Sequence, residues 1–150
     1  MIYLVTGGRG FIGSHFVEKV LEEGHEVIDI DKMTYAANTK LSFDVHPRYT
    51  HIKEDICEID HLPTCDIIVN FAAESHVDNS IESPRVFLKS NTDGVFNLLS
   101  LLRAKVYQKP LFVHISTDEV YGDVNEGEKT EDSILSPSNP YSATKAAAEM

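Results

Sequence analysis

The stretch that decides the fold is "IYLVTGGRGFIGSH", which runs from Ile2 to His15. Its first five residues form a short apolar run, which is typical of a buried strand. Gly7, Gly10 and Gly13 follow in a G-x-x-G-x-x-G spacing, and an amphipathic helical pattern starts among them. Such glycines allow a sharp turn, a close backbone approach to a pyrophosphate, and tight packing of helix on strand. The stretch therefore predicts a strand–turn–helix unit that can hold a dinucleotide.

The next apolar run supports this interpretation. "EVIDID" ends at Asp31, and an acid after the second strand can accept both hydrogen bonds of an adenosine ribose. The same acid would repel the 2′-phosphate of NADP, so the combination indicates NAD. A glycine pattern without such an acid also occurs in plain strand-to-helix turns. Arg9 and Lys32 are cationic neighbours that work against the preference, which leaves NADP open as an alternative.

A strand-then-helix alternation continues along the chain. Further strands are expected at "YTHIK", "DIIVNFAA" and "LFVHIS". We expect helices after the glycine loop up to Gly24, from a Ser83 cap to about Lys105, and from an Asn139 or Ser138 cap onward. Such alternation implies a parallel sheet with right-handed crossovers. We predict one α/β domain over residues 1–150, a Rossmann-type doubly wound sheet in the order 3-2-1-4-5. Residues 122–137 are expected to form a loop.

The composition excludes several classes of partner. The chain is 42% hydrophobic, and 24 acidic against 13 basic residues give a formal charge of -11. An acidic chain is repelled by phosphate backbones and anionic lipid, so we expect neither nucleic acid nor a membrane as partner. The sequence has no apolar run of membrane-spanning length, and "MIYLVTGG" at its start lacks the basic region of a signal peptide. With only two cysteines, these features predict a cytoplasmic protein with reduced thiols.

One group of potential metal ligands needs a separate test. Cys57, His61 and Cys65 are spaced four apart, which would place them on one face of a helix. Pro63 interrupts that helix, and no fourth ligand stands at a usual zinc spacing. We therefore expect no metal site.

Tyr141 and Lys145 share one face of the last predicted helix. The simplest interpretation is an amphipathic tyrosine beside a solvated lysine. The functional interpretation is that the Lys145 ammonium favours the phenolate of Tyr141, since a free tyrosine with a pKa of about 10 is a poor base near neutrality. A positive nicotinamide nearby would act in the same direction. Such a base could take the proton of an alcohol while NAD takes the hydride.

Four separated motifs now point to a known family. "TGGRGFIG", "NFAAESHVDNSI", "HISTDEVYGD" and "NPYSATKAAAEM" resemble the extended short-chain dehydrogenase/reductase family, and within it the nucleotide-sugar 4,6-dehydratases. The resemblance runs the length of the chain. It implies an NAD-dependent lyase that converts dTDP-glucose or UDP-glucose to the 4-keto-6-deoxy sugar.

The resemblance also assigns roles to residues. The catalytic set would be Thr117, Asp118, Glu119, Tyr141 and Lys145. The substrate would be approached by Ser75, His76 and Thr117. The cofactor would be contacted by Tyr141, Lys145 and the residues Gly7, Gly10, Phe11, Ile12, Gly13, Asp31, Lys32, Thr34, Asp55, Ile56, Ala72, Ala73 and Ser90.

The adjacent acids Asp118 and Glu119 separate this reaction from its relatives. Oxidation at C4 acidifies the C5 proton, and loss of the C6 hydroxyl then needs a base and an acid. By resemblance Glu119 is the base and protonated Asp118 the acid, which requires the chain to leave the strand ladder at Thr117. A solvated strand end is the simpler interpretation of an isolated acid pair. Similar epimerases carry small hydroxyl residues here, and similar decarboxylases and GDP-mannose dehydratases keep the glutamate without the aspartate.

Three alternatives stay open at this point. The chain could belong to a nucleotide-sugar epimerase, to a decarboxylase, or to a non-catalytic NAD-binding fragment. Family members usually continue for a stretch of comparable length that covers the nucleotide sugar, whereas this sequence stops at Met150, inside the Tyr–Lys helix. We therefore expect an NAD-binding domain without its substrate domain. By the same resemblance, the helices at 83–105 and 140–150 would form a homodimer interface.

Overall fold

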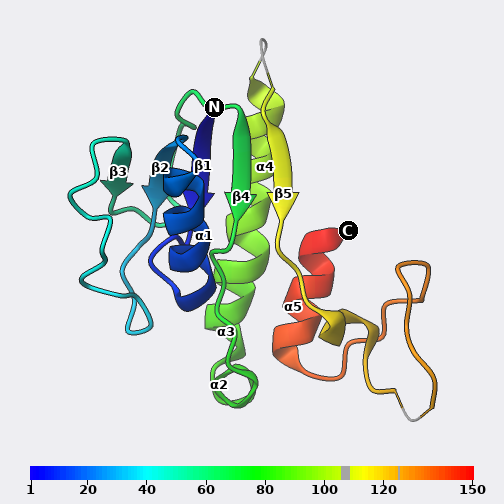
Figure 1. Cartoon of the computed structure of the whole chain (residues 1–150). Coiled ribbons are helices and arrows are strands. Elements are labelled where there is room, and N and C mark those ends of the chain that lie inside the picture. The colour runs from blue at the N-terminus through cyan, green and yellow to red at the C-terminus, as the bar shows by residue number, and fades with distance from the viewer. Residues whose placement is uncertain (106–108, 125) are drawn as a thin grey trace.

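The structure, a computed structural model, describes residues 1–105, 109–124 and 126–150. Within these residues, parallel strands form one five-stranded sheet in the order β3-β2-β1-β4-β5, which confirms the predicted order (Figure 1). The strands are β1 (Ile2–Thr6), β2 (Glu26–Ile30), β3 (Tyr49–Ile52), β4 (Ile67–Asn70) and β5 (Leu111–His114). The order reverses direction beside β1, so the crevice beyond the ends of β1 and β4 is the expected place for a ligand.

Helices follow β1, β4 and β5, whereas the connections from β2 to β3 and from β3 to β4 contain turns and no helix. They are α1 (Phe11–Glu22), α2 (Val77–Glu82), α3 (Pro84–Phe87), the π-helix η1 (Leu88–Asp93), α4 (Gly94–Ala104), the 3₁₀ turn η2 (Asp118–Tyr121) and α5 (Pro140–Glu149). Gly24 follows α1 with a φ of 88°, which fits its predicted role as the helix stop. None of the helices in the described part of the chain is long and apolar enough to cross a membrane.

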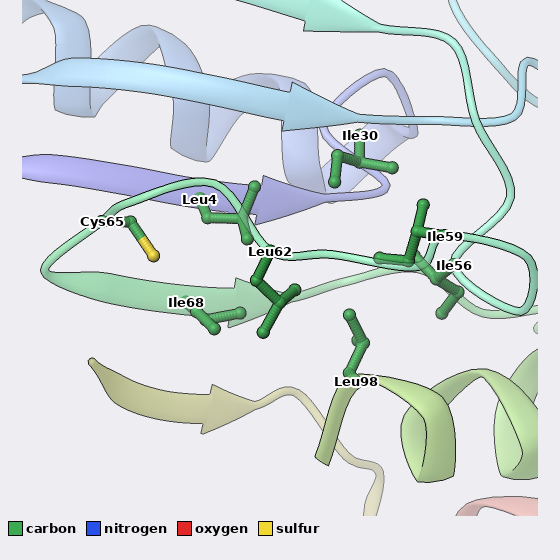
Figure 2. Packing of buried hydrophobic residues seen from close by; sticks show 8 residues of the cluster. All are labelled: Leu4, Ile30, Ile56, Ile59, Leu62, Cys65, Ile68 and Leu98. Carbon is green, nitrogen blue, oxygen red and sulfur yellow. The ribbon is translucent and has the colours of Figure 1, made fainter. Parts of the chain in front are cut away.

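The core has two layers because neighbouring residues of β1 point to opposite faces of the sheet. Leu4 packs on one face in a cluster with Ile30, Ile68 and Leu98 of α4 (Figure 2). Val5 packs on the other face with residues of α1, including Val17 and Val20. Both faces of the central strand are therefore covered by helices, as a doubly wound sheet requires.

The predicted helix from Ser83 to about Lys105 is present. α3, η1 and α4 follow one another without a break from Pro84 to Ala104, with Pro84 at the first helical position. Ser83 makes no capping hydrogen bond through its side chain, and the short helix α2 precedes it. The middle of the helix is the π-helix η1, a form often found at functional sites. A Cβ at Gly94 would lie 2.6 Å from Ile56 Cδ1, so the helix lies close against that side chain.

The start of α5 is as predicted. The Asn139 side chain accepts from the backbone N–H of Ser142, and the Ser142 hydroxyl accepts in return from the N–H of Asn139. Pro140 occupies the first helical position. This capping box fixes the helix start and thereby the direction in which Tyr141 leaves the backbone. Residues 122–124 and 126–137 contain turns and bends without helix or strand, and residue 125 lies outside the described part of the predicted loop.

Candidate functional site

A pocket lies at the carboxyl ends of β1, β2 and β4. Ten of the residues expected to hold a cofactor line it: Gly7, Gly10, Asp31, Lys32, Thr34, Asp55, Ile56, Ala72, Ala73 and Ser90. Residues that the sequence analysis did not single out complete the lining: Ile30, Ala36, Ala37, Glu54, Phe71 and Glu74. The expected cofactor residues thus converge from separate strand ends on one cavity.

The glycine loop forms the floor of this pocket. Gly7 has a φ of 72°, and a Cβ there would lie 2.7 Å from the backbone nitrogen of Ala72, so only glycine fits. A Cβ at Gly13 would collide with the carbonyl oxygen of Gly7, which explains the third glycine. Gly10 begins α1 without a side-chain cap, so the first N–H groups of the helix can receive an anion. Phe11 and Ile12 are exposed beside them, outside the pocket lining.

Asp31 is held in place by main-chain donors. Its Oδ2 accepts from the N–H of Arg9 at 3.1 Å, and its Oδ1 accepts from the N–H of Met33 at 2.8 Å. An ionised carboxylate offers about four acceptor sites, so two hydrogen bonds leave room for two more. The side chain is therefore oriented to accept from a diol, such as the ribose of an adenosine.

The cations near Asp31 are both engaged. The Arg9 guanidinium is buried, with 4% of the residue exposed, and its Nη1 donates to Asp44 at 2.7 Å. Arg9 therefore does not act as a free cation beside Asp31, in contrast to the expectation from the sequence, because its charge is paired with Asp44. Lys32 Nζ donates to Ser90 Oγ at 2.9 Å and lies 3.6 Å from Asp55 Oδ2, along the pocket wall.

The predicted acid pair lies on a 3₁₀ turn, not on the strand. β5 ends at His114, so the chain has left the ladder before Thr117, as the double role of the acids requires. Thr117 Oγ1 accepts from the N–H of Glu119 at 3.3 Å. Glu119 Oε2 in turn accepts from Asn139 Nδ2 at 3.1 Å, so the residue that caps α5 also orients the glutamate.

Tyr141 lies on the first turn of α5, next to the acid pair. Its N–H donates to the hydroxyl of buried Ser80 at 3.1 Å, which ties the helix start to α2. Burial raises the pKa of Tyr141, the charges of Glu119 and Asp118 add to the rise, and the Thr117 hydroxyl offsets part of it. The contact of α5 with η2 places the phenol near the threonine and the two carboxyl groups.

Lys145 is also buried, but its hydrogen bonds lead to the end of β5. Its Nζ donates to the carbonyl of Ile115 at 2.6 Å and lies 3.3 Å from Nε2 of His114. Burial lowers the pKa of Lys145 to about 8, with Glu149 opposing the change. The pKa of Tyr141 is not lowered in the chain by itself, in contrast to the expectation for the pair, because burial outweighs the other influences.

Comparison with known proteins assigns this arrangement to a family. Residues 4–150 match the family model described as GDP-mannose 4,6 dehydratase. The chain belongs to the GDP-mannose 4,6 dehydratase family. This membership supports the resemblance stated from the four motifs.

Relatives within the family are similar over the whole chain. It is 44% identical to the low-salt glycan biosynthesis protein Agl12 of Haloferax volcanii, covering 100% of this chain and 50% of that protein. It is 41% identical to a dTDP-glucose 4,6-dehydratase of Xanthomonas campestris, covering 98% and 46%. The crystal structure of DesIV, a dTDP-glucose 4,6-dehydratase from Streptomyces venezuelae solved with NAD bound, has a TM-score of 0.89 at 42% identity and covers 99% and 49%. The chain spans about half the length of the curated relatives it matches.

Two expected substrate residues lie apart from the pocket of this family member. Ser75 and His76 follow β4, are exposed, and do not line the cavity. Tyr141 and Lys145 lie outside the lining as well. The adenosine part of the site and the part that carries the titratable groups are therefore adjacent but separate regions.

Sequence reasoning missed the residues that hold these groups in place. Asn91, in the π-helix, accepts from the N–H of Glu74 at 2.8 Å and donates to its carbonyl and to Thr144 of α5. Asn70 contacts Nδ1 of His114 at 2.9 Å. A usable signal existed for two of them, because Asn70 and His114 are polar residues inside apolar runs, where a polar group needs a partner.

Proposed function

We propose that this chain is the NAD-binding part of an NAD-dependent nucleotide-sugar 4,6-dehydratase that acts on dTDP-glucose or UDP-glucose. One observation carries the proposal. A hydroxyl, two carboxyl groups and a phenol lie at the start of η2 and of α5, two elements in contact, beside a pocket lined by the glycine loop and Asp31. The dTDP-glucose 4,6-dehydratases among the relatives fit this arrangement. Most contacts to the nucleotide of the substrate are proposed to lie in the half of such enzymes that this chain does not span.

The residues present fit NAD. Asp31 would accept from the adenosine ribose, and the start of α1 with Gly7 and Gly10 would receive the pyrophosphate. Asp55 and Ile56 would lie near the adenine, and Phe11 and Ile12 along the pyrophosphate. Ala72, Ala73 and Ser90 would continue the wall toward the nicotinamide. When bound, NAD supplies the hydride acceptor for the first step and the hydride donor for the last.

The first step would be oxidation at C4. Thr117 holds the C4 hydroxyl, and Tyr141 takes its proton as the phenolate. The raised pKa of Tyr141 makes that phenolate scarce in the chain by itself. We propose that a positive nicotinamide and the ammonium of Lys145 together favour the phenolate when cofactor is present. Lys145 is held within the site by Ile115 for this purpose.

The second step would be loss of water across C5 and C6. Glu119 removes the C5 proton, which the 4-keto group has made acidic, and Asp118 protonates the departing C6 hydroxyl. The hydride then returns to C6 and C5 regains a proton. The two acids differ in surroundings, since Glu119 is partly buried and accepts a hydrogen bond from Asn139, whereas Asp118 is exposed. Different environments are what allow two carboxyl groups to divide acid and base roles.

We also propose a homodimer in the cytoplasm. Val86 and Leu88 of the α3–η1 segment and Phe96 and Leu99 of α4 are between 41% and 71% exposed. Four large apolar side chains on one helical segment are consistent with the interface that the family resemblance implies. The two cysteines are free, as expected in a reducing compartment.

The proposal is tested by the product of the full-length protein. Incubated with NAD and dTDP-glucose in heavy water, it should form a sugar that has lost the mass of one water and carries solvent deuterium at C5. UDP-glucose is assayed in parallel to identify the nucleotide. A product of unchanged carbon skeleton and oxygen content would indicate an epimerase, loss of carbon dioxide from an acidic sugar would indicate a decarboxylase, and no reaction with any of these would favour a non-catalytic module.

A further inference from the structure

Arg9 lies inside the glycine loop, yet its side chain is bonded away from the pocket. Its Nε donates to the carbonyl of Asn38 at 2.9 Å, and its two terminal nitrogens donate to the carboxylate of Asp44 at 2.7 and 3.3 Å. Nη1 also contacts the hydroxyl of Tyr49 at 3.3 Å. A fork–fork pair of this kind is among the stronger charge-assisted contacts and is directional.

The backbone of Arg9 lies next to Asp31, the acid proposed to bind the ribose. The N–H of Arg9 donates to Asp31 Oδ2, so an Arg9 side chain that turned the other way would bring its guanidinium beside Asp31. An arginine near that position is the means by which dinucleotide-binding folds accept the 2′-phosphate of NADP. The same residue could therefore support either cofactor, depending on which way its side chain points.

We infer that Asp44 is a specificity-determining residue, because it holds the Arg9 guanidinium away from the 2′ position of the bound cofactor. Asp31 then acts without a competing cation, and NADP is rejected by an unneutralised carboxylate. The inference rests on the proposed use of NAD. Three further contacts keep the arrangement fixed: the N–H of Leu41 donates to Asp44, and Asn38 donates to the carbonyl of Arg9 through its N–H and its side-chain Nδ2.

If Arg9 loses its contact with Asp44, the nearby carboxylate of Asp29 is not free to replace it, because Asp29 already has hydrogen-bond partners. Asp29 is fully buried and accepts from the N–H of Gly8 at 2.9 Å and from the hydroxyl of Tyr49 at 2.8 Å. Tyr49 uses its one proton in that bond, so its oxygen can only accept from Arg9. Asp44, by contrast, is 33% exposed, and replacing it removes the carboxylate that neutralises the buried Arg9 guanidinium, which favours a conformation in which Arg9 finds another partner or water. Removing the Asp44 charge should thus release Arg9 toward Asp31 and solvent.

The test measures dissociation constants of NAD and NADP for the full-length protein without sugar. Asp44→Asn keeps the shape and an acceptor for Leu41 but removes the charge. It should narrow the preference for NAD over NADP by about tenfold, the value of one charged hydrogen bond gained by the 2′-phosphate. The matched control is Glu58→Gln, which removes a carboxylate paired with Lys89 at 3.1 Å away from the pocket and should leave the ratio unchanged. Asp44→Ser carries the same expectation should the asparagine variant not fold.

Arg9→Gln tests whether the Arg9 guanidinium is the cation that narrows the preference for NAD in Asp44→Asn. As a single substitution, Arg9→Gln should leave the ratio of the NADP and NAD dissociation constants within about twofold of wild type. The reason is that the guanidinium held by Asp44 does not contact the cofactor. In the double variant with Asp44→Asn, Arg9→Gln should restore the wild-type preference for NAD over NADP. Equal losses of NAD and NADP affinity in Asp44→Asn, or a widened ratio in Arg9→Gln alone, would overturn the inference. These binding measurements contain no sugar, so they remain valid even if the protein does not catalyse dehydration. A wild-type protein that binds neither NAD nor NADP would overturn both the role of Asp44 and the proposed NAD-dependent function.

Discussion

The two parts of the site are built by different kinds of contact. On the adenosine side, the backbone does most of the positioning: Asp31 is held by two main-chain N–H groups, and Gly7 lies against the backbone of Ala72. On the side of the proposed sugar chemistry, side chains reach between distant elements, such as Asn139 to Glu119 and Ser80 to the backbone of Tyr141. The comparison teaches that the cofactor pocket depends on local chain geometry, while the reactive groups depend on tertiary contacts.

The largest expected effect comes from removing the phenol of Tyr141, which should affect the proposed sugar chemistry but not cofactor binding. Tyr141→Phe keeps the ring and its edge contact with Phe87 but removes the base. We expect oxidation of the sugar by bound NAD to fall by about 10²–10⁴, with NAD binding nearly unchanged, because the phenol acts on the substrate alcohol. The measurement is single-turnover formation of reduced cofactor.

The control for this variant is Tyr3→Phe, since Tyr3 lies on β1 and stacks on His25, away from the reactive groups. If Tyr141→Phe reduces NAD at the wild-type rate, Tyr141 is not the base. If it loses NAD affinity in parallel with its rate, the two parts of the site are not independent.

Gly7→Ala should disturb the adenosine side through the backbone. The substitution combines a positive φ with a Cβ placed 2.7 Å from Ala72 N, and we expect the free energy of unfolding to fall by about 2–4 kcal/mol. Gly127→Ala is a matched control, because Gly127 has a φ of 81° with open space around it and should lose only about 1–2 kcal/mol. Urea denaturation of both variants isolates the contact from the conformational cost. Equal losses of unfolding free energy in the two variants would show that the close approach of Gly7 to the backbone of Ala72 does not affect stability.

The smallest expected effect is a pH dependence on the side of the sugar chemistry. Burial, with the charge of Lys145, lowers the pKa of His114 to about 4, against about 6.5 for a free histidine. Between these values the unfolded chain binds a proton that the folded chain does not, so stability is lost as the pH falls from 6.5 toward 4. His114→Gln should make that loss shallower, as measured by denaturation midpoints across this range. His61→Gln, at an exposed histidine, should keep the wild-type slope, and an unchanged slope in His114→Gln would show that His114 does not contribute.

The fold could be predicted because its signals are local. The strand ending in glycines, the acid at Asp31 and the Asn139–Pro140 helix start are each encoded within a few neighbouring residues, and the structure has all three. The extent of the long helix could be predicted as well, whereas propensity contains no sign of the π-helix η1 in its middle. That segment is tied to other elements by Asn91 and Thr92, which contact Glu74 and α5 at long range.

The electrostatics of the candidate site could not be predicted from the sequence. Spacing alone could place Tyr141 and Lys145 on one helix face, yet it could not show that Lys145 bonds Ile115 and His114 at the end of β5. In the same way, Arg9 reads as a free cation in the sequence. Its partner Asp44 lies 35 positions along the chain, within the connection between β2 and β3, and only folding brings the two together.

The central claim is that Glu119 is the base of the dehydration step, and solvent exchange at C5 tests it most directly. In Glu119→Gln the shape and the contact with Asn139 persist while the base is lost, and oxidation at C4 still depends on Tyr141. The full-length variant should therefore accumulate reduced cofactor and a 4-keto sugar, with dehydration slowed by about 10²–10⁴. In heavy water, wild type should place deuterium at C5, and Glu119→Gln should place almost none. Exchange at C5 in Glu119→Gln at the wild-type rate would contradict the account.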